Sequence, residues 1–260
     1  LPNISSNEIE RLSCLESLPL WLVNEIVNWL GIEEAKYVIK AFNKKPSIDL
    51  RINPMKTNLN NFLKKLKECN INASPINKLC DGVALNSNPR SIKNLPGYHD
   101  GIWVVQDRAS QWIAPFLNPM KGEKILDACS APGSKTTHIA ALVNDDAEIL
   151  AVDRSEKRLK ILQSNLERLN IKSVKTFKAD ATNLIDINPN FISYFDKILI
   201  DAPCSGIGTF ARNPDIRWSL SKDKIHQLII LQESLLEYLI PLLKKNGTLV
   251  RSEEHTSELQ

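Results

Sequence analysis

The sequence predicts an α/β fold with a doubly wound parallel sheet, preceded by a small α+β module. Three observations predict it. From Gly122 onward, short apolar runs alternate with segments whose apolar residues have helical spacing. Four of these runs end in or near an aspartate, as parallel strands that lead into a ligand cleft often do. Before Gly122, shorter helical and strand-like segments are mixed. Strands that alternate with helices imply a parallel sheet, because each helix carries the chain back to begin the next strand.

The bulk properties limit the classes of protein to consider. A length of 260 residues allows one or two domains, and no apolar run reaches the ~18 residues of a membrane span. No signal-peptide pattern opens the chain. The five cysteines lack the CxxC spacing of zinc sites and disulfide frameworks. We therefore expect a monomer in the reducing cytoplasm that binds neither a membrane nor a metal ion.

The first part of the chain is predicted to be a polar linker, residues 1–19, followed by the small module in residues 20–95. Helical spacing of apolar residues predicts helices at 21–30, 33–42 and 58–69. Alternation of apolar and polar residues predicts a half-buried strand at 48–52, with shorter strands near Ala73 and Val83. A loop with several Pro and Gly residues, 87–97, separates this module from the rest of the chain.

The larger part, residues 96–250, is predicted to hold the parallel sheet. A strand at 101–105 leads into a helix that starts within residues 106–111. The strands expected in the sheet cover residues 124–128, 148–152, 173–178 and 197–200. The helices expected between and after them cover residues 135–142, 155–169 and 222–243. A further strand begins at Gly247 and is cut at its start, so we expect the sheet to be incomplete at its C-terminus.

The last ten residues, 251–260, do not continue the strand pattern of Gly247–Val250. They match, in order, the translation of a common sequencing-library adapter. We interpret them as an artefact and exclude them from the fold, with a natural polar tail as the alternative. The chain also begins with Leu rather than Met, so we expect its N-terminus to be incomplete.

Four aspartates, Asp127, Asp153, Asp180 and Asp201, lie at or next to the ends of predicted strands. In an open parallel sheet these ends meet at one edge, where ligands bind. Asp153 lies one strand–helix–strand step beyond the first loop, where an acid typically holds ribose hydroxyls. Asp180 is placed to line an adenine pocket. Each aspartate taken alone has the alternative interpretation of a helix cap or a turn residue.

The loop after the first strand of the sheet has the sequence Cys129-Ser130-Ala131-Pro132-Gly133-Ser134-Lys135, without the GxGxxG of nicotinamide dehydrogenases. Its small residues let backbone N–H groups approach a ligand, and both Lys135 and a helix N-terminus favour a carboxylate. S-adenosyl-L-methionine carries a carboxylate, a ribose and an adenine. We therefore predict that this cofactor is bound by residues 129–135 with Asp153, Asp180 and Asp201.

Five motifs together resemble, in order, those of the RNA cytosine-5 methyltransferases. They are Asp127–Thr137, Ala151–Asp153, Lys178–Asp180, Asp201–Gly206 and Arg212–Trp218. The closest likeness is to the Sun/RsmB group, which acts on bacterial 16S ribosomal RNA. The resemblance covers about Trp21 to Val250 and implies a Rossmann-like class I methyltransferase domain, preceded by an RNA-recognition-like module. Ser134 stands where the family usually has a second glycine. Serine is small, so we expect at most a modest effect on cofactor binding.

The resemblance implies covalent catalysis with two cysteines. A thiolate that adds to C6 of cytosine makes C5 nucleophilic towards the methyl group, and loss of the C5 proton and of the thiolate restores the ring. By resemblance, Asp201 stabilises the adduct near N3 and Cys204 assists its breakdown. The attacking cysteine is expected in a Thr-Cys motif just after Val250, where residues 251–260 stand instead. The chain of 260 residues is therefore expected to lack its nucleophile and to be inactive.

RNA is the expected partner, in particular 16S ribosomal RNA. Residues 36–67 hold eight lysines and Arg51 against a single acid, Asp49. Such a cluster suits a phosphate backbone, with a solvated helical face as the alternative.

Other interpretations of the site are open to different degrees. The context of Cys204 disfavours a DNA cytosine methyltransferase, and an adenine amino-methyltransferase would need an Asn/Asp-Pro-Pro-aromatic strand end, which is absent. A non-catalytic RNA-binding protein with this cofactor fold remains an alternative, because the attacking cysteine is missing. The alternative for Cys204 is an inert buried thiol, and Cys129 is better explained by loop packing than by chemistry. His138 and His226 are interpreted as structural or solvated.

Overall fold

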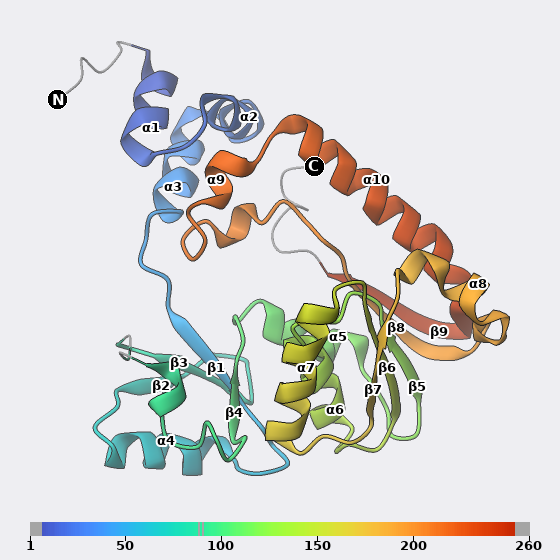
Figure 1. Ribbon diagram of the computed structural model, residues 1–260. Coiled ribbons are helices and arrows are strands. Elements are labelled where there is room, and N and C mark those ends of the chain that lie inside the picture. The colour runs from blue at the N-terminus through green and yellow to red at the C-terminus, as the bar shows by residue number, and fades with distance from the viewer. Residues whose placement is uncertain (1–6, 88, 90, 253–260) are drawn as a thin grey trace. The chain divides into compact units, whose positions relative to one another are not determined.

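Two sheets organise the molecule. The computed structural model describes residues 7–87, 89 and 91–252. One sheet is antiparallel with strand order β2-β3-β1-β4, and the other has strand order β7-β6-β5-β8-β9 (Figure 1). The described chain divides into two compact units. The first contains the chain up to Pro46 together with Pro203–Ile230, and the second contains Ser47–Ala202 with Leu231–Ser252. Both sheets belong to the second unit.

The five-stranded sheet confirms the predicted fold class. Its strands, all parallel to their neighbours, are β5 (Lys124–Asp127), β6 (Glu148–Asp153), β7 (Val174–Lys178), β8 (Phe195–Asp201) and β9 (Leu243–Ser252). One face is covered by α5 (Ile113–Leu117), α6 (Ser134–Leu142) and α7 (Glu156–Leu169). The other face is covered by α8 (Leu184–Ile187) and by the later part of α10 (Lys222–Leu239). Because both faces are buried, β5, β6 and β8 are rich in apolar residues, which makes them recognisable in the sequence.

The C-terminal end of this sheet differs from the prediction. Helix α10 ends at Leu239 and not at residue 243, because Pro241 has no N–H to continue it and residues Ile240–Leu242 form a 3₁₀ turn. Strand β9 consequently begins at Leu243, earlier than expected. It also continues through Arg251 and Ser252, two residues that the adapter interpretation excludes from the fold, and Ser252 is in register with Asp201.

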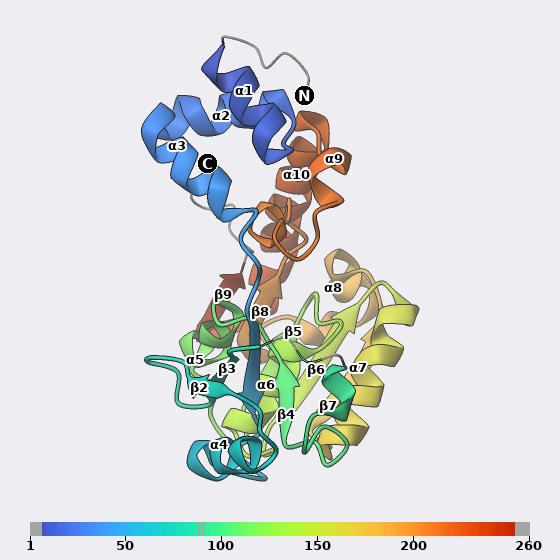
Figure 2. The same cartoon turned by 90° about the vertical axis from the view of Figure 1, so that its left-hand side faces the viewer.

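The antiparallel sheet belongs to the small module. Its strands are β1 (Ile48–Ile52), β2 (Ala73–Pro75), β3 (Gly82–Leu85) and β4 (Trp103–Val105). Helix α4 (Leu59–Glu68) begins where the Asn58 side chain accepts the N–H of Asn61, and it packs on one face of the sheet (Figure 2). Strand β4, which the sequence pattern assigns to the larger part of the chain, pairs with β1 of the small module. Strand β1 is also buried on both faces, and not half-buried as expected.

The first unit is helical. It contains α1 (Glu8–Glu16), α2 (Leu20–Leu30), α3 (Ile32–Ala41) and α9 (Ile216–Ser219) around one apolar core. Helix α1 lies in the segment expected to be linker, where Asn7 caps its first turn. The buried Arg217 donates to the carbonyls of Glu16 and Phe42, and so ties residues after β8 to α1 and α3. The predicted module is therefore divided, with residues 20–46 in the first unit and the rest in the second.

Membrane insertion by a helix has no support in the described residues. None of the helices within residues 7–252 that the structure describes is both long and apolar enough to cross a bilayer.

Candidate functional site

The candidate site lies at the carboxyl ends of β5 and β8. The chain runs from β5 outward through β6 to β7 on one side, and returns to place β8 and β9 on the other side of β5. The order of the strands therefore reverses between β5 and β8. In open α/β sheets, ligands bind in the crevice that such a reversal creates. The predicted cofactor loop follows β5, and Asp201 ends β8.

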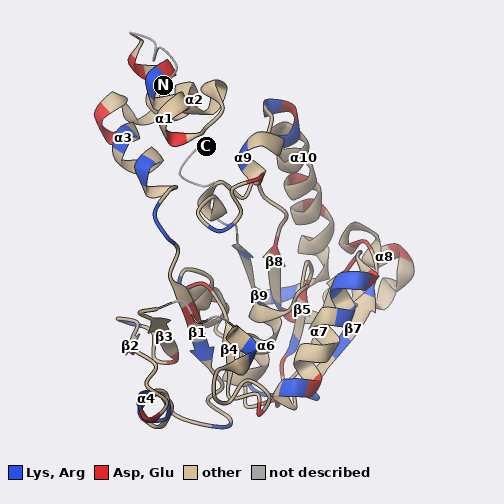
Figure 3. Cartoon of the chain, turned by 60° about the vertical axis from the view of Figure 1, so that its left-hand side comes forward, with Lys and Arg blue, Asp and Glu red and all other residues tan. Residues whose placement is uncertain are grey.

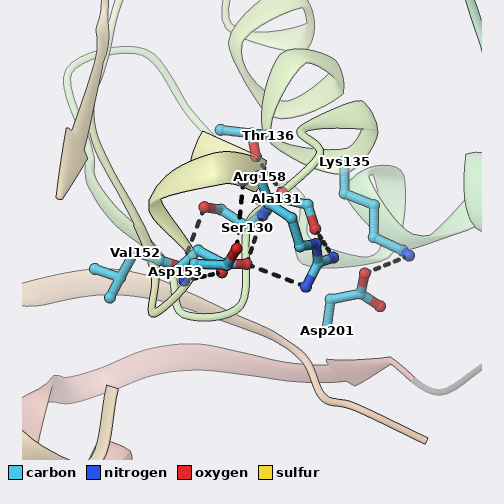
Figure 4. A network of polar contacts seen from close by, with 9 residues as sticks. Ser130, Ala131, Lys135, Thr136, Val152, Asp153, Arg158 and Asp201 are labelled. Carbon is cyan, nitrogen blue, oxygen red and sulfur yellow. Dashed lines mark hydrogen bonds and ion pairs between the residues drawn. The ribbon is translucent and has the colours of Figure 1, made fainter. Parts of the chain in front are cut away.

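The loop after β5 is fastened to the neighbouring strand β6. The backbone N–H and the hydroxyl of Ser130 both donate to the carbonyl of Val152, at 2.9 and 3.1 Å. The N–H of Ala131 donates to Oδ2 of Asp153 at 3.2 Å (Figure 4). Gly133 has φ +103°, and a Cβ at this position would collide with Cδ1 of Leu162 on α7. Only glycine therefore fits where the loop turns into α6.

Asp153, the predicted ribose ligand, lies beside this loop and is 5% exposed. Its Oδ1 accepts the N–H of Ser155 at 2.8 Å, and Nη1 of Arg158 lies 3.5 Å from Oδ2. The Arg158 guanidinium also donates to the carbonyl of Ala131 (Figure 4). Sequence reasoning missed Arg158. The available signal was Ser155, whose side chain caps α7 and thereby places Arg158 in the first turn, next to the loop.

Asp180 and Cys129 have ordinary structural roles. Oδ1 of Asp180 accepts both the N–H and the hydroxyl of Thr182, at 3.1 and 2.8 Å, so this exposed aspartate caps the short 3₁₀ turn that follows β7. Its role in an adenine pocket stays a prediction. Burial raises the pKa of the Cys129 thiol to about 12, which keeps it neutral and unreactive. Cys129 packs against the core on the α10 side of the sheet.

Lys135 and Asp201 form an ion pair at the sheet edge. Nζ of Lys135 lies 2.7 Å from Oδ2 of Asp201, and the lysine side chain is almost completely buried (Figure 4). The sequence predicts that this ammonium holds the carboxylate of the cofactor. In the structure the partner of this ammonium is Asp201, and its role towards the cofactor stays a prediction. Because Asp201 is more exposed than Lys135, the pair leaves a fixed carboxylate partly accessible at the sheet edge.

Asp127 supplies an acceptor next to the cofactor loop. The hydroxyl of Thr136 donates to its Oδ2 at 2.6 Å, whereas the buried Oδ1 has no partner among the described residues. Burial raises the pKa of Asp127 to about 7, against the opposing effect of the Thr136 hydrogen bond. An unsatisfied buried oxygen, a loop of small residues and the carboxylate of Asp153 fit a ligand with an amino group and a ribose, as S-adenosyl-L-methionine has.

Cys204 follows Asp201 by three positions in the sequence. It is half-buried and belongs to the segment Pro203–Ile230 of the first unit. His226 is exposed, whereas His138 is buried within α6 and its pKa is held well below the usual value by that burial. Within the described residues, no group of three or more His, Cys, Asp or Glu side chains is arranged to hold a metal ion.

The basic cluster of residues 36–67 is only partly available for RNA. Lys36 pairs with Glu8 and Glu33, and Lys56 donates to the carbonyl of Asp100. Arg51 is only 2% exposed, and its guanidinium donates hydrogen bonds to Gln106 and Thr137. It is therefore not accessible to an RNA phosphate. The exposed lysines that remain lie on α4, at the end of α3 and in the segment just after α3, and α7 carries others outside the predicted cluster (Figure 3).

The comparison with known families decides the assignment. Residues 114–254, more than half of the chain, match the model of the 16S rRNA methyltransferase RsmB/F family. The chain belongs to this family. Residues 18–92 match the ferredoxin-like domain of RsmF/B-like methyltransferases. The match confirms both the family resemblance and the fold class.

Individual relatives agree with this assignment. The chain is 40% identical over 250 residues to the probable ribosomal RNA small subunit methyltransferase B of Synechocystis sp., covering 96% of this chain and 56% of the relative. Among solved structures, a methyltransferase homolog protein from Pyrococcus horikoshii is 28% identical, with a TM-score of 0.83 over 98% of this chain and 82% of that one. NSun6 from the same organism, solved with SFG, shares the fold at 22% identity, with a TM-score of 0.84 over 95% of this chain and 86% of NSun6. The chain spans about half the length of the curated relatives it matches.

Membership of this family confirms the predicted cofactor, because methyltransferases of this fold use S-adenosyl-L-methionine. Which residues of the sheet edge hold it stays a prediction.

Proposed function

We propose that this chain is part of an enzyme that methylates C5 of a cytosine in 16S ribosomal RNA, in the cytoplasm, through a covalent cysteine–C6 adduct. The observation that carries the proposal is the Lys135–Asp201 ion pair at the sheet edge. A carboxylate fixed by a buried lysine, three residues before the cysteine of a Pro-Cys sequence, suits a site that holds the N3 edge of a cytosine while a thiol acts on its ring.

Each residue has a distinct task in this proposal. The cofactor supplies an electrophilic methyl group on its sulfonium when bound. Asp201 holds the base and stabilises the adduct near N3, while Lys135 orients Asp201. Cys204 assists loss of the thiolate after the C5 proton has been removed. Asp153 holds the ribose of the cofactor beside the loop at Ala131.

The position of the attacking cysteine is supported by the register of β9. This strand lies beside β8, and Ser252 is in register with Asp201. A cysteine immediately after β9 would leave the sheet at the same edge as Asp201. The sequence contains no cysteine after Cys204, so a protein of these 260 residues is expected to bind cofactor without transferring its methyl group.

The division of labour between the parts is also a proposal. Residues 20–95 would contribute to RNA binding and residues 96–250 to methyl transfer, with the target base leaving its stack to reach the sheet edge.

The test is the chemical identity of the product. The complete gene product, incubated with unmodified 16S ribosomal RNA and labelled cofactor, is expected to yield 5-methylcytidine on nucleoside analysis. Label on another base, or on the exocyclic amino group of cytosine, would contradict the proposal.

A non-catalytic RNA-binding protein is the second candidate, because the sequence lacks a cysteine after β9. Sequencing the gene beyond the codon for Val250 separates the two. A Thr-Cys pair within a few codons favours the enzyme, and a genuine in-frame tail without one favours the binding protein.

A further inference from the structure

A fully buried arginine connects the small module to the cofactor loop. Arg51 lies in the middle of β1, where alternation sends neighbouring side chains to opposite faces. Leu50 and Ile52 join the apolar cluster under α4, which also contains Phe62 and Leu66. Arg51 therefore points to the other face of the antiparallel sheet.

The partners of Arg51 lie on that other face. Its Nε donates to Oε1 of Gln106 at 2.6 Å. Its Nη2 donates to the hydroxyl of Thr137 at 3.1 Å and to the carbonyl of Ser134 at 3.4 Å. Ser134 and Thr137 both belong to the first turn of α6, and they flank Lys135 in the sequence. One guanidinium thus holds the turn that joins the cofactor loop to the Lys135–Asp201 pair.

We propose that Arg51 is a positioning residue for cofactor binding. By fixing the first turn of α6 against β1, it holds the loop of residues 129–134 in the geometry that receives S-adenosyl-L-methionine. The inference rests on the cofactor assignment and is independent of the covalent step. It also gives the small module a second role, as a support of the cofactor site.

The electrostatics of Arg51 agree with a positioning role. Burial lowers the pKa of its guanidinium to about 9, while the charge of Asp81 acts in the opposite direction. A cation near the N-terminal turn of α6 is not favoured by the helix dipole. Arg51 therefore contributes to the position of α6 through the directions of its hydrogen bonds. Its planar guanidinium donates to several acceptors at once, which the single ammonium group of a lysine could not reach together.

A second arginine ties the module to the other helix of the site. Nη1 of Arg168, near the end of α7, donates to the carbonyls of Tyr98 and Trp103 at 2.8 and 3.1 Å. Its guanidinium lies over the Tyr98 ring at 4.4 Å from the centroid. Both helices that follow the cofactor-binding strands, α6 and α7, are therefore fastened to the small module.

The experiment compares two arginines that differ in what they touch. Arg51→Met removes the donors at similar volume. Arg108→Met is the matched control, because Arg108 pairs with the buried Asp49 of the same strand at 2.7 Å and also donates to Ser47, both within the module. Binding of S-adenosylhomocysteine to the 260-residue chain is measured by calorimetry, well below the unfolding temperature of each variant. We expect at least tenfold weaker binding for Arg51→Met and a change within about twofold for Arg108→Met.

Two further variants keep the test decisive. Thr137→Val removes one acceptor on α6 with little change in volume, and we expect about threefold weaker binding even if Arg51→Met fails to fold. Arg51→Lys keeps the charge but not the fork, and its affinity should fall between those of wild type and Arg51→Met. Wild-type affinity in Thr137→Val and in a folded Arg51→Met would overturn the inference, as would equal weakening by Arg108→Met. A wild-type chain that does not bind the ligand would overturn the cofactor assignment as well.

Discussion

Lys135 lies in the first turn of helix α6 and Asp201 ends strand β8, yet Nζ of the lysine lies 2.7 Å from Oδ2 of the aspartate. Sixty-six positions separate these residues in the sequence. The switch in strand order between β5 and β8 brings them together. A buried lysine that neutralises a partly exposed carboxylate fixes both its charge and its direction. We therefore propose that Lys135 orients the carboxylate that holds the base and does not bind the cofactor.

Replacing Lys135 tests which role it has. In the complete gene product, Lys135→Met should lower methyl transfer by on the order of 100-fold, because Asp201 loses the cation that orients it. Affinity for S-adenosylhomocysteine should stay within about threefold of wild type. Lys178→Met, which breaks the exposed pair with Glu156, is the control and should change neither quantity. If cofactor affinity falls as much as turnover does, Lys135 binds the carboxylate of the cofactor and the proposed role is wrong.

Asp153 is expected to hold the ribose. Asp153→Ala should weaken cofactor binding by about 1–3 kcal/mol, the effect of removing a buried polar partner. Asp145→Ala is the control, because Asp145 also accepts two backbone N–H groups, those of Lys172 and Ser173, and it lies before β6 begins. Calorimetry with S-adenosylhomocysteine measures both variants. Unchanged affinity for Asp153→Ala would remove Asp153 from the ribose site.

Two glycines with positive φ, Gly122 and Gly133, allow the effect of backbone strain to be distinguished from the effect of filling space in the cofactor loop. Gly133→Ala adds a methyl group that meets Leu162, whereas Gly122→Ala meets no atom within 4 Å. We expect Gly122→Ala to lower the free energy of unfolding by about 1 kcal/mol and to leave cofactor binding intact. Gly133→Ala should lower it by about 2–4 kcal/mol and weaken cofactor binding. Equal effects of the two substitutions in urea unfolding and calorimetry would show that the loop tolerates a side chain.

Asp127 should make stability depend on pH. Its pKa is about 7 in the fold, against the ordinary value of 3.8, so its favourable contribution is present below about pH 4 and is lost as the pH rises to about 7. Asp127→Asn keeps an acceptor for Thr136 and removes the titration. The free energy of unfolding of this variant relative to wild type should therefore rise between pH 4 and pH 7, by on the order of 2–4 kcal/mol. Urea unfolding titrations at several pH values across this range measure the difference in stability between the variant and wild type. A difference that does not change with pH would mean that burial does not raise the pKa of Asp127.

The parallel sheet could be predicted well from the sequence, because its pattern is local. Apolar runs such as Lys197–Ile200 end at an aspartate, and β8 ends at Asp201 as expected. Pro241 is a local signal too, but its effect on the end of α10 and the start of β9 was missed. Helix α1 was missed because its segment is polar overall, and its cap at Asn7 is the main signal that could have revealed it.

The contacts of the site could not be predicted in the same way. The chemistry of Lys135 suits a carboxylate from any source, and only the folded chain shows that Asp201 lies within reach of it. Arg51 lies in a basic segment, where the sequence suggests that it binds phosphate. In the structure its side chain is buried between β1 and α6, where it donates to Thr137. Such pairings depend on residues far apart in the chain, which neither periodicity nor spacing records.

The release role of Cys204 tests the two-cysteine account most directly. In a gene product that carries a Thr-Cys pair after β9, Cys204→Ala should leave attack on C6 intact and slow the breakdown of the adduct. Mixed with 16S ribosomal RNA and cofactor, this variant should give a slow-migrating RNA–protein species on a denaturing gel, which wild type does not accumulate. Replacing the attacking cysteine as well should abolish that species. Normal turnover by Cys204→Ala with no adduct on the gel would contradict the covalent two-cysteine mechanism.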